Sequence, residues 1–521
     1  MIWNIFKKDL AQLWLLSALV SIVHLANATL WFVLGPFKEP QGLVIVAQVF
    51  SFLTLLGNLV LITFLVHQEA LPGVSQDWLI RPIRRRDLLL SKFLFLLTIV
   101  HGPMLLADVA HASAAGFAFP EAIATAFSRN VFILLVFSLP ALAIAAITRT
   151  LVQVATVLLA IWFVVVIGVG LAMLVRGGGA PVFAANGIQW MTPAFWSLLA
   201  FSAAAVAIPL QYFRRATHQA RGIVAAAVLL APLLSLSTWA AAFSVQQRLS
   251  PNPSLAGPIT IAFDPSLGRS SVEPGSTSRN TVLLPLRVSG LSPDSFLMND
   301  HADIRLIAPD GVTLYRGRTT ANIGYRDDLP VRTTAGGEVT THQRIEFPDK
   351  LSELILTQPV RVELEYSLTL FSVAAANTIS ASNGDGRFAA FGWCRTKLDD
   401  DGDDIGLGCV KTGGAPACIS VTLENPTNGM RNPENLVCDP DYAPYSVHIF
   451  PDSMNQSGGG IRFRDLQRLA KFPVDGSQLD VAQVTLKSYR PVAHFTRRLV
   501  IPDIHLNEWR ADVVADHALA R

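Results

Sequence analysis

The sequence predicts a multi-span α-helical membrane domain followed by an all-β, β-sandwich-like domain outside the cytoplasm. Of the 521 residues, 51% are hydrophobic and only 15% are charged, and the mean hydropathy is +0.41. A typical soluble domain has about 25% charged residues. This composition excludes a disordered chain and argues against a purely soluble one. The net charge of +2 provides no global field that would attract nucleic acid.

Charged residues are unevenly distributed along the chain. Residues 1–245 contain 14 Lys and Arg and 7 Asp and Glu, whereas residues 246–521 contain 27 and 32. The first part is therefore sparsely charged and basic, and the second is normally charged and acidic. We expect a membrane domain at 1–245, a proline-containing linker at 246–257 and a β-rich domain at 258–521.

Seven apolar segments are long enough for transmembrane helices, because about 20 apolar residues cross the hydrocarbon core. The fourth and fifth form one run, which we divide at Arg149, and Pro140 predicts a kink in the fourth. Alternatively, the first segment is a signal peptide cleaved near Leu25–Ala28, which would leave six spans. The seven segments are 12–34, 43–66, 88–110, 131–148, 151–175, 193–213 and 222–243.

Basic residues predict which side of the membrane each connecting segment occupies. If the N-terminus is cytoplasmic, the inner segments contain eleven Lys and Arg residues and the outer loops contain only Lys38, Arg129 and Arg176. Basic residues near span ends mark the cytoplasmic side, so this asymmetry favours a cytoplasmic N-terminus. Seven spans then place residues 244–521 outside the cytoplasm.

All four cysteines lie within 45 residues of the second part, namely Cys394, Cys409, Cys418 and Cys438. An even number of clustered cysteines predicts disulfides in an oxidising compartment, and all three pairings remain open. A four-cysteine zinc site is the alternative. The absence of a C-x-x-C pair argues against it.

Alternating apolar and polar residues in the second part predict antiparallel strands with one solvated face. Nine or more such strands are typical of one or two β-sandwich modules, and residues 505–521 fit a short terminal helix. The strand segments are 258–264, 281–289, 303–308, 343–347, 360–371, 418–424, 445–450, 481–489 and 493–501.

An acidic run containing Asp399, Asp401 and Asp403 resembles part of a calcium loop. Carboxylates at alternate positions can converge on a hard cation. However, Lys397 occupies the first ligand position and Gly408 the twelfth. We therefore favour a solvated acidic loop, with a weak calcium site as the alternative, and we expect no other cofactor in this chain.

Three ionisable residues within the predicted spans are candidates for a functional site. His24 lies in the first span, and His101 and Asp108 lie seven residues apart in the third, on one helical face. A proton relay or a polar substrate path could use them. We favour the simpler interpretation, in which Asp108 lies near the interface and the histidines bond to neighbouring helices. Asn27 and Asn58 are expected to be interhelical hydrogen-bonding partners.

The segment between the second and third spans carries the most informative motif. It contains Asp77-Trp78, Arg81-Pro82, the cluster Arg84-Arg85-Arg86, Asp87 and Lys92. Charge alone would explain it as a short loop whose arginines meet anionic lipid head groups. The order of tryptophan, proline, basic cluster and lysine also resembles the first cytoplasmic loop of type-two ATP-binding-cassette permeases.

This resemblance implies a core of six spans, two permease subunits and two separate cytoplasmic ATPase subunits that hold ATP and Mg²⁺. A seventh span and a large external domain depart from the family pattern. The sequence contains no G-x-x-x-x-G-K-[ST] phosphate loop and no recognisable hydrolase motif, so we expect no enzymatic activity in this chain. The resemblance assigns coupling and ATPase docking to Trp78, Arg81, Pro82, Arg84, Arg85, Arg86, Asp87 and Lys92.

We therefore expect a permease-like subunit of an ATP-driven exporter, acting as a homodimer or in a permease pair. It would lie in a bacterial-type inner membrane, with a cytoplasmic N-terminus and a periplasmic β domain that binds cargo or a partner. One alternative is a non-transporting membrane anchor that presents an external binding or structural domain. Another is an envelope enzyme with an active site in the β domain. Co-purification with an ATPase would separate the transporter from the anchor.

Overall fold

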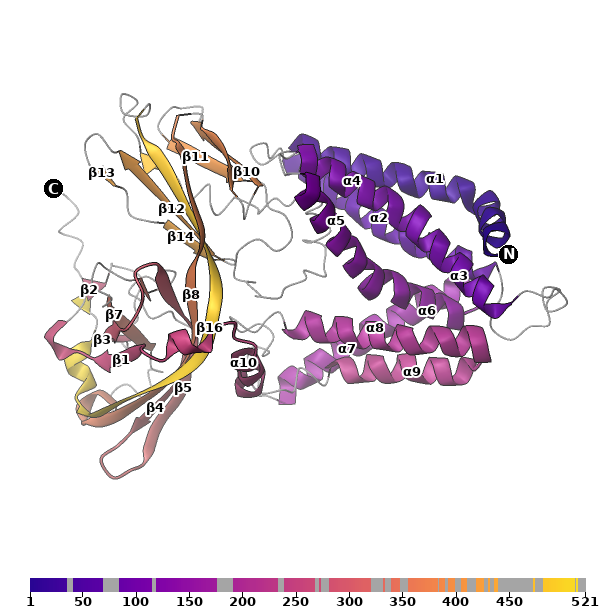
Figure 1. Cartoon of the computed structure of the whole chain (residues 1–521). Helices are drawn as coiled ribbons and strands as arrows, with labels where there is room; N and C mark the ends of the chain where they lie inside the picture. The colour runs from indigo at the N-terminus through magenta and orange to yellow at the C-terminus, as the bar shows by residue number, and fades with distance from the viewer. Residues whose placement is uncertain are drawn as a thin grey trace.

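The computed structural model contains a helical region and a strand-rich region, joined near residue 250 (Figure 1). It describes residues 1–34, 41–68, 84–114, 119–175, 191–232, 239–267, 271–272, 281–319, 331–332, 339–346, 355–382, 384–388, 392–398, 404–409, 418–425, 430–431, 435–438, 472–473, 481–510 and 512–513.

Six helices among the described residues are long and apolar enough to cross a membrane. They coincide with the first six predicted spans. Three of them contain a π-helical turn. Such a turn separates α3 from α4 and α5 from α6, and a third turn follows α8. The six are α1 (Ile2–Leu34), α2 (Gln41–His67), α3 (Arg85–Phe95) with α4 (His101–Ala114), α5 (Phe119–Ile133) with α6 (Leu139–Ile147), α7 (Leu151–Val175) and α8 (Met191–Pro209) extended to Arg214.

The fourth spanning helix begins at Phe119, well before the predicted start at residue 131. Arg129 therefore lies inside α5 and not in an outer loop, which corrects the sequence-based assignment. Near Pro140, where the sequence predicts a kink, the helix contains a π-helical turn at Leu134–Ser138, which ends two residues before the proline. Proline lacks the N–H that a regular helix would use at this position, and a π turn is one way to absorb that loss.

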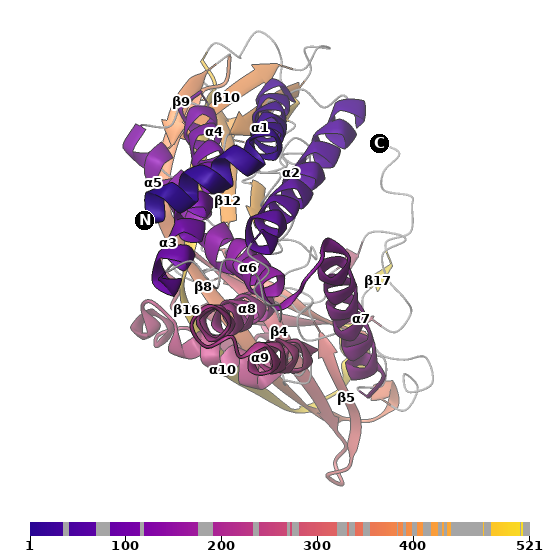
Figure 2. The same ribbon diagram turned by 90° about the vertical axis from the view of Figure 1, so that its right-hand side faces the viewer.

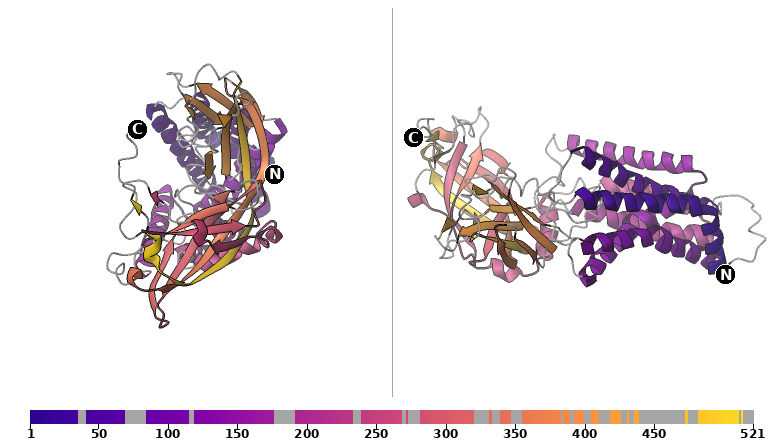
Figure 3. Two further views of the ribbon diagram at one scale, coloured as in Figure 1. Left: turned by 90° about the vertical axis from the view of Figure 1, so that its left-hand side faces the viewer. Right: turned by 90° about the horizontal axis from the view of Figure 1, so that it is seen from above.

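The seventh predicted span, 222–243, does not appear as one long helix among the described residues. It is represented by α9 (Thr217–Leu230), which has 14 residues, and by α10 (Trp239–Arg248). Fourteen helical residues extend about 21 Å, less than the ~30 Å hydrocarbon core. The N-terminus and the strand-rich region nevertheless lie at opposite ends of the helical region (Figure 3, right).

Two long strands form the spine of the strand-rich region. β8 (Val360–Ser380) and β16 (Gln483–Ile504) pair antiparallel along nearly their whole length. They belong to the largest, curled sheet, which has the order β13-β12-β16-β8-β4-β5, with β14 pairing β12 and β6 pairing β4. Its other strands are β4 (Ser295–Ile307), β5 (Thr313–Thr319), β6 (Val331–Arg332), β12 (Cys418–Asn425), β13 (Met430–Arg431) and β14 (Asn435–Cys438).

Three smaller sheets accompany the large one. One has the order β1-β3-β7, formed by β1 (Thr260–Phe263), β3 (Thr281–Ser289) and β7 (Val339–Glu346). A second has the order β15-β11-β10-β9, formed by β9 (Asp385–Phe388), β10 (Gly392–Leu398), β11 (Asp404–Cys409) and β15 (Phe472–Pro473). The third pairs β2 (Ser271–Val272) with β17 (Asp512–Val513).

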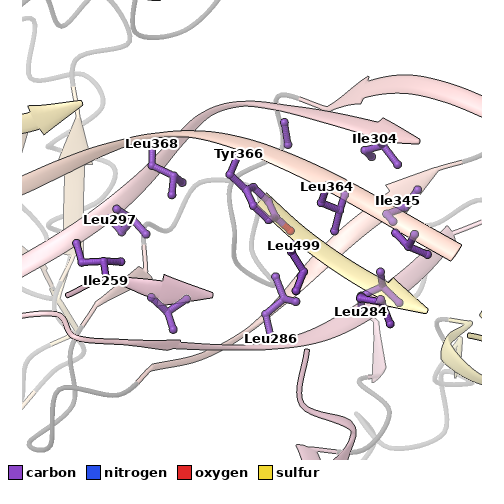
Figure 4. Close-up of a cluster of buried hydrophobic side chains, with 14 of the residues drawn as sticks. Ile259, Leu284, Leu286, Leu297, Ile304, Ile345, Leu364, Tyr366, Leu368 and Leu499 are labelled. Atoms are coloured by element: carbon purple, nitrogen blue, oxygen red, sulfur yellow. The ribbon is translucent and has the colours of Figure 1, made fainter. Parts of the chain in front are cut away.

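The main core of this region lies between the β1-β3-β7 sheet and the large sheet. Leu284 and Leu286 from β3 contact Leu364, Tyr366 and other side chains from the large sheet within one buried cluster (Figure 4). The apolar cluster joins the two sheets, and the β-sandwich itself stays a prediction. Burial raises the pKa of the Tyr366 phenol, because the charged form is disfavoured in this core.

Several predicted strand limits differ from the structure. The predicted strands 481–489 and 493–501 are one strand, β16, which contains a register shift between Pro491 and Ala493. A bulge lets a strand accommodate a proline, so the sequence signal for a break marks an irregularity instead. The predicted terminal helix is limited to a 3₁₀ turn at Leu506–Trp509 within the described residues. The predicted strand 445–450 lies outside them.

The predicted linker is packed against the strand-rich region. Helix α10 extends to Arg248, and the indole of Trp239 stacks on the His301 ring at 4.4 Å between centroids. Gln246 Nε2 donates a hydrogen bond to Nδ1 of His494 over 3.0 Å. The Asn252 amide donates to the carbonyl of Val492 over 2.8 Å. These contacts fix the chain between the last helix and β16.

Candidate functional site

A polar pocket lies within the helical region, between α1, α2, α4 and α5. Figure 2 shows these four helices grouped on one side of the bundle, apart from α7, α8 and α9. Leu106 and Phe127, which lie two residues before the pocket residues Asp108 and Arg129, are exposed on the outside of the helices. The polar residues that line the pocket are His24, Asn27, Ser51, Thr54, Asn58, Asp108 and Arg129.

Helices α1 and α2 meet at the pocket through two hydrogen bonds. The Ser51 hydroxyl donates to Asn27 Oδ1 over 3.0 Å. His24 Nε2 lies 3.2 Å from Asn58 Oδ1 and donates to it, because a carbonyl oxygen can only accept. Both asparagines therefore join neighbouring helices, as the sequence predicts. Their oxygen atoms are both used by these bonds.

Helices α4 and α5 contribute an ion pair to the same pocket. Arg129 Nη1 donates to Asp108 Oδ1, and Asn130 Nδ2 donates to Asp108 Oδ2 over 3.3 Å. The Asp108 side chain is 6% exposed and that of Arg129 is 22% exposed. A buried carboxylate requires such partners, because desolvation of an isolated charge is costly.

His101 lies behind the pocket and connects it to two π-helical turns. Its Nδ1 lies 3.3 Å from Asn130 Oδ1, and its Nε2 lies 3.0 Å from the Ser138 hydroxyl. A neutral imidazole satisfies both bonds by donating from Nδ1 and accepting at Nε2. His101 directly follows the π turn Leu96–Val100, and Ser138 ends the π turn Leu134–Ser138. Such turns are frequently found at functional sites.

The structure thus brings the three predicted intramembrane residues into one region. His24 and Asp108 line the pocket, and His101 is joined to Asp108 through Asn130. Sequence reasoning did not identify Arg129 and Asn130 as members of the site. The available signal was the continuous helical pattern from residue 119, which places both residues inside the fourth helix.

A second buried ion pair lies near the other end of the bundle. Lys92 Nζ donates to Asp9 Oδ2 over 2.8 Å, and both side chains are 0% exposed. Lys92 is therefore buried between α3 and α1 and does not face a partner surface. The coupling and docking role that the resemblance assigns to Lys92 stays a prediction.

The remaining residues of the cytoplasmic motif are partly described. Arg84 is the N-cap residue of α3, Arg85 donates to the carbonyl of Phe213, and Asp87 lies in the first turn. A carboxylate in the first turn of a helix interacts favourably with the helix dipole. The arginines Arg84, Arg85 and Arg86 are exposed. Trp78, Arg81 and Pro82 lie outside the described residues.

The cysteines lie opposite one another on paired strands. In the antiparallel register, Cys394 of β10 faces Cys409 of β11, and Cys418 of β12 faces Cys438 of β14. The acidic residues Asp399, Asp401 and Asp403 lie outside the described residues. Within the described part of the chain, no group of three or more His, Cys, Asp or Glu side chains could hold a metal ion.

Comparison with models of known protein families gives no match for this chain, and a search of curated proteins also gives none. The resemblance to type-two permeases therefore stays a prediction from the cytoplasmic motif.

Proposed function

We propose that this chain is a permease-like subunit that couples a separate cytoplasmic ATPase to the movement of a substrate. The observation that carries the proposal is the polar pocket within the spans. Ionisable groups inside membrane helices are costly, and they usually belong to a substrate or ion pathway. A pocket lined by the Asp108–Arg129 pair therefore favours a pathway over a purely anchoring role.

The contacts of α3 support a route from the cytoplasmic motif to this pocket. Helix α3 begins at Arg85, directly after the motif, and Lys92 ties it to Asp9 of α1. The same α1 carries His24 and Asn27 at the pocket. Beyond the π turn, α3 continues into α4, which carries Asp108. A displacement of the motif would therefore reach two of the four helices that form the pocket.

The ATPase partner is tested by affinity purification of the full chain from its native membrane. We expect an ATP-binding-cassette ATPase to co-purify, and the variant Trp78→Ala with Arg81→Ala to lose it. A matched control is Arg149→Ala, which removes an exposed arginine outside the motif. Purification of the unaltered chain without any ATPase, together with no ATP-dependent flux in proteoliposomes, would favour the membrane anchor instead.

The strand-rich region is proposed to be periplasmic and to bind cargo or a partner of the transporter. Its cysteine pairs support this location, because residues directly opposite on antiparallel strands have Cα atoms about 4.5–5.5 Å apart, within the range of a disulfide. We therefore propose the pairs Cys394–Cys409 and Cys418–Cys438. Peptide mapping of the non-reduced protein would detect these two linkages, and any other pairing would contradict the proposal.

A further inference from the structure

The hydrogen bonds that line the intramembrane pocket engage its amide and carboxylate oxygens. Asn27 Oδ1 accepts from Ser51, and Asn58 Oδ1 accepts from His24. Both carboxylate oxygens of Asp108 accept from α5, one from Arg129 and the other from Asn130. The strongest acceptors around the cavity are therefore already bonded to protein.

The donors of the same residues are in surplus. Within the described part of the chain, the side-chain N–H₂ groups of Asn27 and Asn58 have no protein acceptor. Arg129 uses only Nη1, so its Nε and Nη2 donors are also available among the described residues. All three residues line the pocket, so an acceptor-rich ligand there would offer partners to these donors.

We propose that this pocket binds an oxyanion, a phosphate or carboxylate group, with Arg129 as its cationic partner and Asn27 and Asn58 as neutral donors. The planar guanidinium donates readily to the oxygens of both groups. Binding of the oxyanion is independent of the proposed function. Only the further step, that this oxyanion is part of the transported substrate, rests on it. The surrounding helices expose Leu25, Leu106 and Phe127 toward the lipid, so a head group attached to an acyl chain has an apolar neighbourhood for its tail.

Asp108 competes with the ligand for Arg129, and this gives the proposal a distinctive signature. Removal of the aspartate charge by Asp108→Asn frees the guanidinium and tightens oxyanion binding. Removal of the guanidinium by Arg129→Gln weakens it. Simple hydrophobic adsorption of a lipid tail would respond to neither change. Variants of the two partners are therefore expected to shift affinity in opposite directions.

Binding is measured on the purified full chain in a maltoside detergent, which contains no phosphate. Radiolabelled inorganic phosphate is followed by equilibrium dialysis, and dioctanoyl phosphatidic acid by native mass spectrometry. We expect Arg129→Gln to weaken binding roughly 10- to 100-fold, the range of a lost charge-assisted hydrogen bond. Asp108→Asn tightens it several-fold, and Arg149→Gln, an exposed arginine that does not line the pocket, leaves it unchanged.

A double variant guards against misfolding, because Arg129→Gln alone leaves the Asp108 charge without its cation. The combination of Asp108→Asn with Arg129→Gln retains neutrality and is expected to lose binding like Arg129→Gln. Arginine-dependent binding of phosphatidic acid alone identifies a lipid-borne oxyanion, and binding of both probes identifies the free anion as sufficient. Equal affinities in Arg129→Gln and Arg149→Gln would overturn the inference. If the ATPase still co-purified in that case, the proposed function would stand.

Discussion

The helical and strand-rich regions both have an apolar core, but they differ in the apolar side chains that they expose. In the helical region, Leu174 is 75% exposed on the surface of α7, whereas Asp9 and Lys92 are completely buried. In the strand-rich region, Leu364 and Tyr366 are buried in a core between two sheets. Most of the large exposed apolar side chains therefore lie on the helical region, in addition to its buried apolar core.

This contrast identifies the solvent for which each region is built. In water, burial of a leucine side chain stabilises the folded state by about 25 cal/mol for each Å² of apolar surface that it removes from the solvent. Lipid tails are as apolar as leucine, so an exposed leucine on a spanning helix carries no such penalty. Packing in the helical region therefore combines an apolar core with buried ion pairs, and the strand-rich region keeps its large apolar side chains mainly in its core.

The largest expected effect comes from the buried ion pair of the helical region. Lys92→Met removes the cation bound to Asp9, and we expect the free energy of unfolding to fall by about 3–5 kcal/mol. Unfolding in mixed maltoside and dodecyl sulfate micelles measures this change. Replacement of both partners, by Asp9→Leu with Lys92→Met, should recover most of the loss. Lys7→Met, at an exposed position of α1, the helix that contains Asp9, serves as the control.

A leucine substitution tests the contrast directly in both regions. Leu364→Ala should destabilise the strand-rich region by about 2–5 kcal/mol, because it leaves a cavity in the sandwich core. Leu174→Ala, which exchanges one apolar side chain for a smaller one at an exposed position, should change stability by less than about 0.5 kcal/mol. Similar losses for the two variants in thermal unfolding would contradict the assignment of two different solvents.

The junction between the regions should make stability depend on pH. Burial lowers the pKa of His494 to about 4. The unfolded side chain titrates near 6.5, so the stabilisation is fully present above pH 6.5 and is lost as the pH falls toward 4. We expect a loss of up to about 3 kcal/mol over this interval, which urea unfolding at several pH values would detect. The variant His494→Gln should flatten this part of the profile.

The smallest effect is expected from a helix cap at the end of the bundle where α6 terminates. Arg221 donates from Nε and Nη2 to the carbonyl of Ile147, at 3.1 and 2.9 Å. Arg221→Lys keeps the charge but cannot donate in this forked geometry, so we expect a loss of about 1 kcal/mol. The same micellar unfolding assay measures it. A loss as large as that of Lys92→Met would show that the cap and the ion pair are equivalent.

The spans were predictable because hydrophobic length is a local property of the sequence. Helix α7 matches its predicted limits at Leu151 and Val175. The start of the fourth helix was missed because Arg129 was used as evidence for a loop, although Asp108 on the preceding helix neutralises it. Likewise, the sequence around Asp9 gives no sign that it is buried in an ion pair with Lys92, which is 83 residues away. Pairings between distant helices cannot be inferred from periodicity.

The strand-rich region shows the same limit in another form. Alternation predicted the strands around 281–289 and 360–371, but not that β8 would continue to Ser380 or that β16 would pass through Pro491. Both extensions depend on the pairing of β8 with β16, which brings together residues more than 100 positions apart. The register that sets Cys394 opposite Cys409 is local, because it joins the consecutive strands β10 and β11, but the spacing of the cysteines alone left it open.

The packing of α10 against β16 has a mechanical consequence. Trp239 and Gln246 attach α10 to the strand-rich region, and Asn252 attaches the segment that follows the helix. Helix α10 is therefore carried by the strand-rich region, so that a displacement of this region would take the helix with it.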